Sequence, residues 1–69
     1  MKTITLAING ETRSVQGVSH VRELIRHLGI GEDGIAVELN GNIIRRRDWE
    51  HTPVADGDRV EIVQFVGGG

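Results

Sequence analysis

The segment SHVRELIRHLG, residues 19–29, has the one clear helical pattern in this 69-residue chain. Its apolar residues recur at i, i+3, i+4 and i+7, which places them on a single stripe of a helix: Val21, Leu24, Ile25 and Leu28. Ser19 is a typical N-cap and Gly29 a typical helix stop, so the sequence predicts a helix between them. Because a single apolar stripe needs a partner layer, the rest of the chain has to supply that layer.

The segments on both sides of this helix have strand patterns. KTITLAI, residues 2–8, alternates apolar with small or polar side chains, and Asn9-Gly10 after it tolerates the positive φ of a tight hairpin turn. ETRSV, residues 11–15, is expected to return as the second strand of that hairpin. Three further strands are predicted after the helix: GIAVELNG (34–41), NIIRR (42–46) beyond an Asn-Gly turn, and RVEIVQFV (59–66) after the turn residues DGD.

The predicted order is ββαββ with one additional short strand. A right-handed crossover and the lack of a second long helix favour insertion of the last strand beside the first, parallel to it. We therefore expect an α+β fold, a ubiquitin-like β-grasp with a mixed sheet and one helix packed on one face. Residues 1–66 are expected to form this single domain and residues 67–69 a flexible glycine tail. Trp49, in a predicted helical turn RDWE, is expected in the core or at its edge.

Composition excludes several classes of function. The chain has no cysteine, so it has neither disulfides nor a thiolate metal site, which fits the reducing cytoplasm. Its formal charge of -2 argues against nucleic acid as a partner, and no apolar run is long enough to span a membrane. We expect a monomer when the chain is alone, with proteins as its partners.

Neither a metal site nor a catalytic group emerges from the motifs. His20 and His27 are about 10 Å apart along a helix, too far for one ion, so these two and His51 are interpreted as solvated histidines. GIGEDG, residues 29–34, matches a dinucleotide-binding pattern, but it leaves a helix and enters a strand, the reverse of the context that pattern requires. The basic run at residues 45–47 is read as a solvated hairpin end or as a contact with an acidic partner.

The last strand predicts a contact surface. Side chains of a strand alternate between its two faces. If Val60 and Ile62 face the helix, the opposite face therefore carries Glu61, Val63 and Phe65. Two of these are apolar residues on a solvent-facing surface beside the tail, as is typical of a protein contact.

The neighbouring hairpin is expected to complete this apolar patch. Ile44 is assigned to it together with Val63 and Phe65, although the sequence leaves open whether Ile43 is the isoleucine that faces the partner. The alternative for Phe65 is a place at the edge of the core, if a twist or bulge turns it inward.

The chain ends in three glycines, Gly67, Gly68 and Gly69. Residues without Cβ atoms can thread a channel too narrow for side chains, and they leave the α-carboxylate of Gly69 at the tip of an arm. Adenylation of that carboxylate by ATP would make it a good acyl donor. The alternative is a frayed end without a role.

The chain resembles the sulfur-carrier members of the ubiquitin-like superfamily, and within it the ThiS family of thiamin thiazole synthesis. Three stretches carry this resemblance: VRELIRHLGI (21–30), IAVELNGNIIRRRDW (35–49) and GDRVEIVQFVGGG (57–69). The resemblance covers almost the whole chain. The Asn-Gly hairpin followed by Arg-Asp-Trp is moderately specific for this family, whereas the terminal Gly-Gly is shared with all its relatives.

This resemblance implies a carrier and not an enzyme. A ThiF-like adenylyltransferase with ATP and Mg²⁺ would activate Gly69, with Gly67 and Gly68 in its channel. Sulfur from a persulfide donor would then replace AMP to give a thiocarboxylate, which a ThiG-like thiazole synthase would consume. Phe65 and Val66 would position the tail, and the face with Val63 and Phe65 would bind the partners one after the other.

Three alternatives stay open on the sequence. The chain could carry sulfur for another product, such as molybdopterin. It could be a ubiquitin-like modifier joined through Gly69 to lysines, or an adaptor that never uses its C-terminus.

Overall fold

One mixed sheet of five strands forms the frame of the fold, in a computed structural model that describes residues 2–65. One α-helix, α1 (Val21–His27), and a 3₁₀ helix, η1 (Arg46–His51), complete it. The strands are β1 (Thr3–Ile8), β2 (Glu11–Gln16), β3 (Ile35–Leu39), β4 (Asn42–Ile44) and β5 (Arg59–Gln64). The predicted β-grasp is confirmed, with β4 as the additional short strand.

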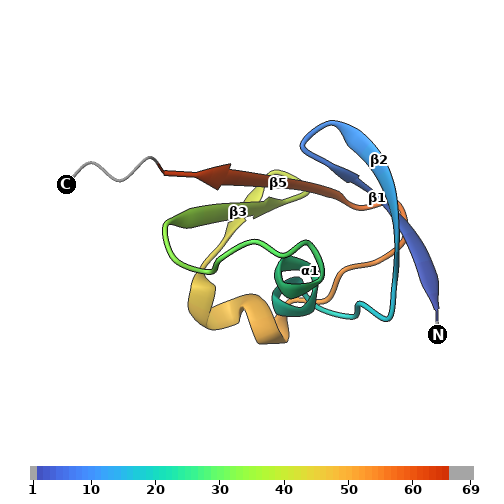
Figure 1. Cartoon of the computed structure of the whole chain (residues 1–69), viewed down its shortest axis with the longest axis horizontal. Coiled ribbons are helices and arrows are strands. Elements are labelled where there is room, and N and C mark those ends of the chain that lie inside the picture. The colour runs from blue at the N-terminus through green and yellow to red at the C-terminus, as the bar shows by residue number, and fades with distance from the viewer. Residues whose placement is uncertain (1, 66–69) are drawn as a thin grey trace.

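The sheet has the strand order β2-β1-β5-β3-β4, so the last strand lies in its middle. β5 runs parallel to β1 and antiparallel to β3, while the hairpins β1–β2 and β3–β4 form the two wings. Figure 1 shows α1 on one side of this sheet and β5 beside β3. The other side of the sheet has no helix over it among residues 2–65, and it is called the open face below.

Helix α1 begins one residue later than the sequence predicts. Its N-cap is His20, not Ser19, and His20 Nδ1 accepts from the Glu23 N–H at 3.3 Å. His20 is still extended because it bridges to Pro53 in the loop before β5, so helical geometry cannot start before Val21. Ser19 instead donates its N–H and its hydroxyl to the Glu23 carboxylate.

The last residue of α1 is His27, and Gly29 stops the helix as predicted, one residue after the C-cap Leu28. This glycine has φ +71°, and its N–H donates to Arg26 O while the Ile30 N–H donates to Ile25 O. Both bonds together form a Schellman motif, in which the left-handed residue is normally glycine.

The core lies between the sheet and α1. Trp49, on η1, is its largest member at 1% exposure, as predicted, and donates its Nε1–H to Ile44 O at 3.0 Å. The buried hydrophobic residues are Ile4, Leu6, Ile8, Val15, Val21, Leu24, Ile25, Val37, Trp49, Val54, Val60 and Ile62. Within the described part of the chain, no helix is long and apolar enough to cross a membrane.

Candidate functional site

Strand β5 carries the end of the chain, and the sheet holds it on both sides. β3 pairs with it along its length, from Leu39 opposite Val60 to Ile35 opposite Gln64. β1 pairs only with the first part of it, Ala7 with Arg59 and Ile8 with Val60. The half of β5 nearer the tail therefore needs another support on the β1 side.

The side chain of Asn9 supplies that support. Its Oδ1 accepts from the Ile62 N–H at 2.7 Å, and its Nδ2 donates to Ile62 O at 3.2 Å. The amide thus replaces the next peptide group of β1. Asn9 has φ +50° in the hairpin turn that the sequence predicts, but its bonds to a strand 53 residues away were not predicted.

The second Asn-Gly turn holds the other end of the same strand. Asn40 (φ +51°) donates its N–H to Arg59 O at 2.8 Å and accepts from the Arg59 N–H through Oδ1 at 2.9 Å. Both hairpin turns therefore also position β5.

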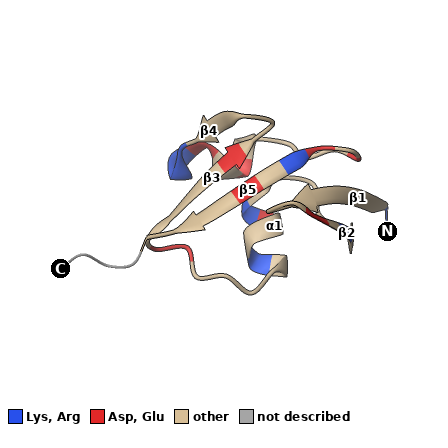
Figure 2. Cartoon of the chain, turned by 90° about the horizontal axis from the view of Figure 1, so that it is seen from above, with Lys and Arg blue, Asp and Glu red and all other residues tan. Residues whose placement is uncertain are grey.

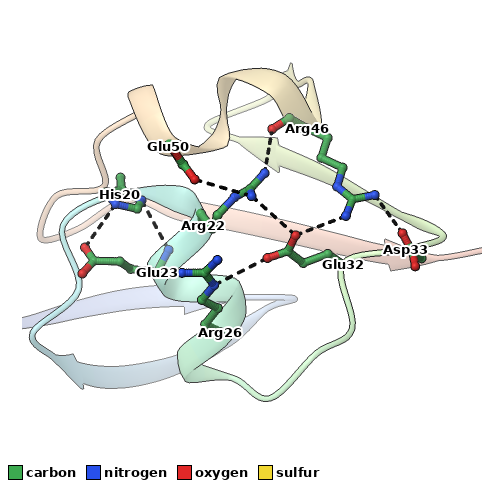
Figure 3. A network of polar contacts seen from close by, with 8 residues as sticks. All are labelled: His20, Arg22, Glu23, Arg26, Glu32, Asp33, Arg46 and Glu50. Carbon is green, nitrogen blue, oxygen red and sulfur yellow. Dashed lines mark hydrogen bonds and ion pairs between the residues drawn. The ribbon is translucent and has the colours of Figure 1, made fainter.

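Where β5 ends, Phe65 is held by the loop that precedes β3. Its N–H donates to Gly34 O at 2.7 Å. The same loop is tied to η1 because Arg46 donates to Asp33 Oδ1 at 2.8 Å and to Glu32 Oε1 at 3.2 Å (Figure 3). These bonds raise the pKa of Arg46 above its ordinary value, and the bond to Asp33 has the larger effect. Within the predicted basic run, Arg46 is thus engaged inside the domain.

The open face exposes three large apolar side chains, as its parity predicts for two of them. Val63 is 52% exposed, Phe65 63% and Ile43 74%. Val63 follows the buried Ile62, so it points away from the helix. Phe65 does not turn into the core, and the expected exposure of both residues is confirmed.

The assignment of Ile44 to this patch is wrong, because Ile44 faces the core and its neighbour Ile43 lies on the open face. Ile44 is half-buried and packs against the core because it lies opposite the fully buried Val37. Residues directly opposite in a sheet share a face. A two-residue turn at Asn40-Gly41 already sets this register, so the sequence contained the signal.

Arginines and acids are paired on the other side of the molecule. Arg22 lies over the ring of Trp49, 5.7 Å from its centroid, and within 3.6 Å of Glu32 and 3.5 Å of Glu50 (Figure 3). Together with Arg46, this network connects α1, η1 and the loop before β3. It is a support for the fold next to the base of the tail.

Residues 2–65 contain no cluster of three or more His, Asp or Glu side chains that could hold a metal ion. His27 and His51 are exposed, while His20 caps α1. Val66, Gly67, Gly68 and Gly69, to which the sequence assigns tail positioning and reactivity, lie outside the described residues. What the structure contributes to the site is its base: a central strand supported from both sides and an exposed apolar face beside it.

Comparison with protein families gives a match to the ThiS family over residues 6–69, which includes the glycine tail. The "Sulfur carrier protein ThiS" of Thermus thermophilus is 34% identical over 62 residues, covering 90% of this chain and 95% of that protein. A crystal structure of the thiamine biosynthesis protein (ThiS) from Geobacter metallireducens superposes with a TM-score of 0.81 at 38% identity, covering 96% of this chain and 100% of that one.

A second kind of relative is larger. The "Thiazole synthase" of Paramagnetospirillum magneticum is 41% identical over 64 residues, which is 93% of this chain but 20% of that protein. The chain therefore spans about a fifth of the length of this relative.

Proposed function

Because the chain belongs to the ThiS family of sulfur carrier proteins, we propose that it carries sulfur for thiamin thiazole synthesis as a thiocarboxylate on Gly69. The single observation that carries this proposal is the family match through the glycine tail, residues 6–69. The chain itself supplies no catalytic group in this proposal. It is the protein substrate of the enzymes that act on it.

The first step activates the carboxylate. A carboxylate oxygen of Gly69 attacks the α-phosphorus of ATP in a ThiF-like adenylyltransferase, pyrophosphate leaves, and an acyl-adenylate forms. Mg²⁺ in that enzyme would balance the phosphate charge. Gly67 and Gly68 would lie in its channel, since residues without Cβ allow a close approach of backbone.

The second step brings in sulfur. The terminal sulfur of a persulfide attacks the acyl carbon and AMP leaves. A thiol then cleaves the remaining sulfur–sulfur bond, so the thiol is oxidised and the thiocarboxylate is released. In a ThiG-like thiazole synthase the sulfur would pass to the substrate, and an oxygen from that substrate or from water would replace it on the acyl carbon, which returns Gly69 to a carboxylate.

The geometry of β5 supports this role. A tail that must enter two enzymes needs a base with a defined direction, and Asn9, Asn40 and the Phe65–Gly34 bond supply it. The exposed Val63 and Phe65 beside the tail are suited to bind each enzyme in turn, with Val66 directing the tail. The relative from P. magneticum, a thiazole synthase with a segment similar to this chain, supports the synthase as a partner.

Intact-mass measurement tests the proposal. After incubation with ATP, Mg²⁺, the adenylyltransferase and a persulfide donor, the chain should gain the mass that distinguishes one sulfur from one oxygen. Ladders on other proteins would indicate a modifier, and no change would favour an adaptor. The chain that has gained sulfur is then given to a thiazole synthase and, separately, to a molybdopterin synthase. The synthase that makes its product from this sulfur identifies the pathway.

Removal of Gly69 is the matched variant. It should abolish the gain of sulfur, because the acyl carbon is then displaced by one residue in the active site. The unfolding transition should stay nearly unchanged, since a terminal glycine has no side chain to bury. A large loss of stability would contradict the assigned role of the tail as a reactive arm.

A further inference from the structure

Two glutamates lie opposite each other in the middle of the open face. Glu38 on β3 pairs directly with Glu61 on β5, and both alternate with core residues, so both side chains leave the sheet on the open side. Figure 2 shows acidic stretches, in red, on both β3 and β5, and the register of these two strands pairs Glu38 with Glu61. Like charges directly opposite in a sheet destabilise it.

Neither acid of this pair forms an ion pair among residues 2–65, since no Arg, Lys or His nitrogen lies within 4.0 Å of either carboxylate. Arg59 lines the same hollow as the two glutamates but stays beyond that distance. On the helix side, by contrast, Glu32 and Glu50 both have arginine partners. Among residues 2–65, these two acids of the helix side are thus held in ion pairs, whereas the two acids of the open face are not.

The acidic pair is surrounded by the exposed apolar residues. Ile43 lies directly opposite Glu38 on β4, and Val63 follows Glu61 on the same face of β5. An apolar surface with an acidic centre is complementary to an apolar surface that presents one positive charge.

We infer that the open face binds a partner surface in which an arginine or lysine inserts between Glu38 and Glu61, while apolar side chains cover Ile43, Val63 and Phe65. This inference rests on the proposed function, and its occupant is the thiazole synthase of that cycle. In the free chain the two carboxylates repel each other. In the complex a cation between them removes the repulsion and forms charge-assisted hydrogen bonds.

The expected signature separates binding from folding. The double substitution Glu38→Gln, Glu61→Gln removes the repulsion, so the midpoint of urea unfolding should stay the same or rise. The same variant should bind the synthase about tenfold more weakly at low salt, because a charge-assisted contact is lost. Its affinity should also depend less on ionic strength than that of the wild type.

Glu11→Gln is the matched control. Glu11 is exposed and lies opposite the core residue Ile8, so this substitution removes one negative charge from the opposite face of the sheet, half of the change that the double variant makes. Its affinity for the synthase should equal that of the wild type, whereas an effect of net charge alone would weaken its binding by part of the loss seen in the double variant.

Isothermal titration of the wild type and both variants with the purified synthase, at two salt concentrations, measures these affinities and tests the inference. Unchanged affinity of the double variant, or a loss that only parallels a loss of stability, overturns the inference. The mass assay of the same wild-type preparation keeps the two proposals apart. A chain that gains sulfur but binds the synthase equally well with and without the glutamates refutes the acidic contact alone, whereas a chain that gains no sulfur refutes the proposed function.

Discussion

The two faces of the sheet differ in how their side chains are satisfied. On the helix side, apolar residues are buried and the arginines that approach the core have acidic partners, as Arg22 has with Glu32 and Glu50. On the open side, three large apolar residues are exposed, and two acids lie opposite each other without an ion pair to any of residues 2–65. Both faces are made by alternate residues of the same strands, so parity along each strand separates the core from the exposed face.

This comparison predicts that substitutions on one face change stability and that those on the other change binding. The most severe test on the helix side is Trp49→Ala. Removal of a fully buried indole should cost about 3–5 kcal/mol of the free energy of unfolding, a large part of what a small domain has. Urea unfolding followed by circular dichroism measures this loss.

Trp49→Phe is the control for that substitution. It keeps most of the apolar volume and loses the bond from Nε1 to Ile44 O, so the loss should be smaller than for alanine. If Trp49→Ala unfolded at the wild-type urea concentration, the helix side would not be the source of stability.

A smaller effect is expected from the support of β5. Asn9→Gly keeps the positive φ but loses both bonds to Ile62, and should cost about 1–2 kcal/mol. Asn9→Ala loses the same bonds but keeps a Cβ in the left-handed region without the amide that makes asparagine tolerant of it, so it should be ~1 kcal/mol less stable than Asn9→Gly. Urea unfolding of both variants separates the two contributions. Equal stability of Asn9→Gly and wild type would mean that the amide does not support the strand.

The elements of the fold could be predicted because their signals are local. The stripe of α1, the two Asn-Gly turns and the alternation in β1 and β5 each lie within a few residues of sequence. The cap of α1 could not, since the choice between Ser19 and His20 depends on the bridge from His20 to Pro53 in a distant loop.

The site was predictable where parity alone decides, as for Val63 and Phe65. Ile43 and Ile44 are adjacent, so one of them had to face the core and the other the open side. The register that the Asn40-Gly41 turn sets between β3 and β4 identifies Ile43 as the exposed one, and the prediction did not use that signal. The contacts of Asn9 and the opposition of Glu38 and Glu61 were missed because both join strands far apart in the sequence.

The N-terminus of α1 gives a smaller, pH-dependent effect. Hydrogen bonds from the Ser19 hydroxyl and N–H hold the pKa of Glu23 below its ordinary value of 4.5. Since the folded chain favours the ionised form, this stabilisation is present above the unfolded pKa and is lost as the pH falls through the folded pKa. Wild type should therefore exceed Glu23→Gln in urea midpoint at pH 7, and the difference should vanish in acid below the folded pKa. A difference that stays constant with pH would contradict this origin.

The smallest change in stability is expected on the open face, with Phe65→Thr. Threonine suits extended backbone and keeps the N–H that bonds Gly34 O, and the ring it replaces is 63% exposed, so the free energy of unfolding should change by no more than about 0.5 kcal/mol. Affinity for the thiazole synthase, measured by titration, should fall nonetheless, because an aromatic side chain that a partner covers contributes much of the binding energy. Ile62→Thr is the matched control three residues earlier, where the same hydroxyl enters the core and should lower the urea midpoint. If Phe65→Thr lost stability as Ile62→Thr does, or bound the synthase like the wild type, parity along β5 would not divide folding from binding.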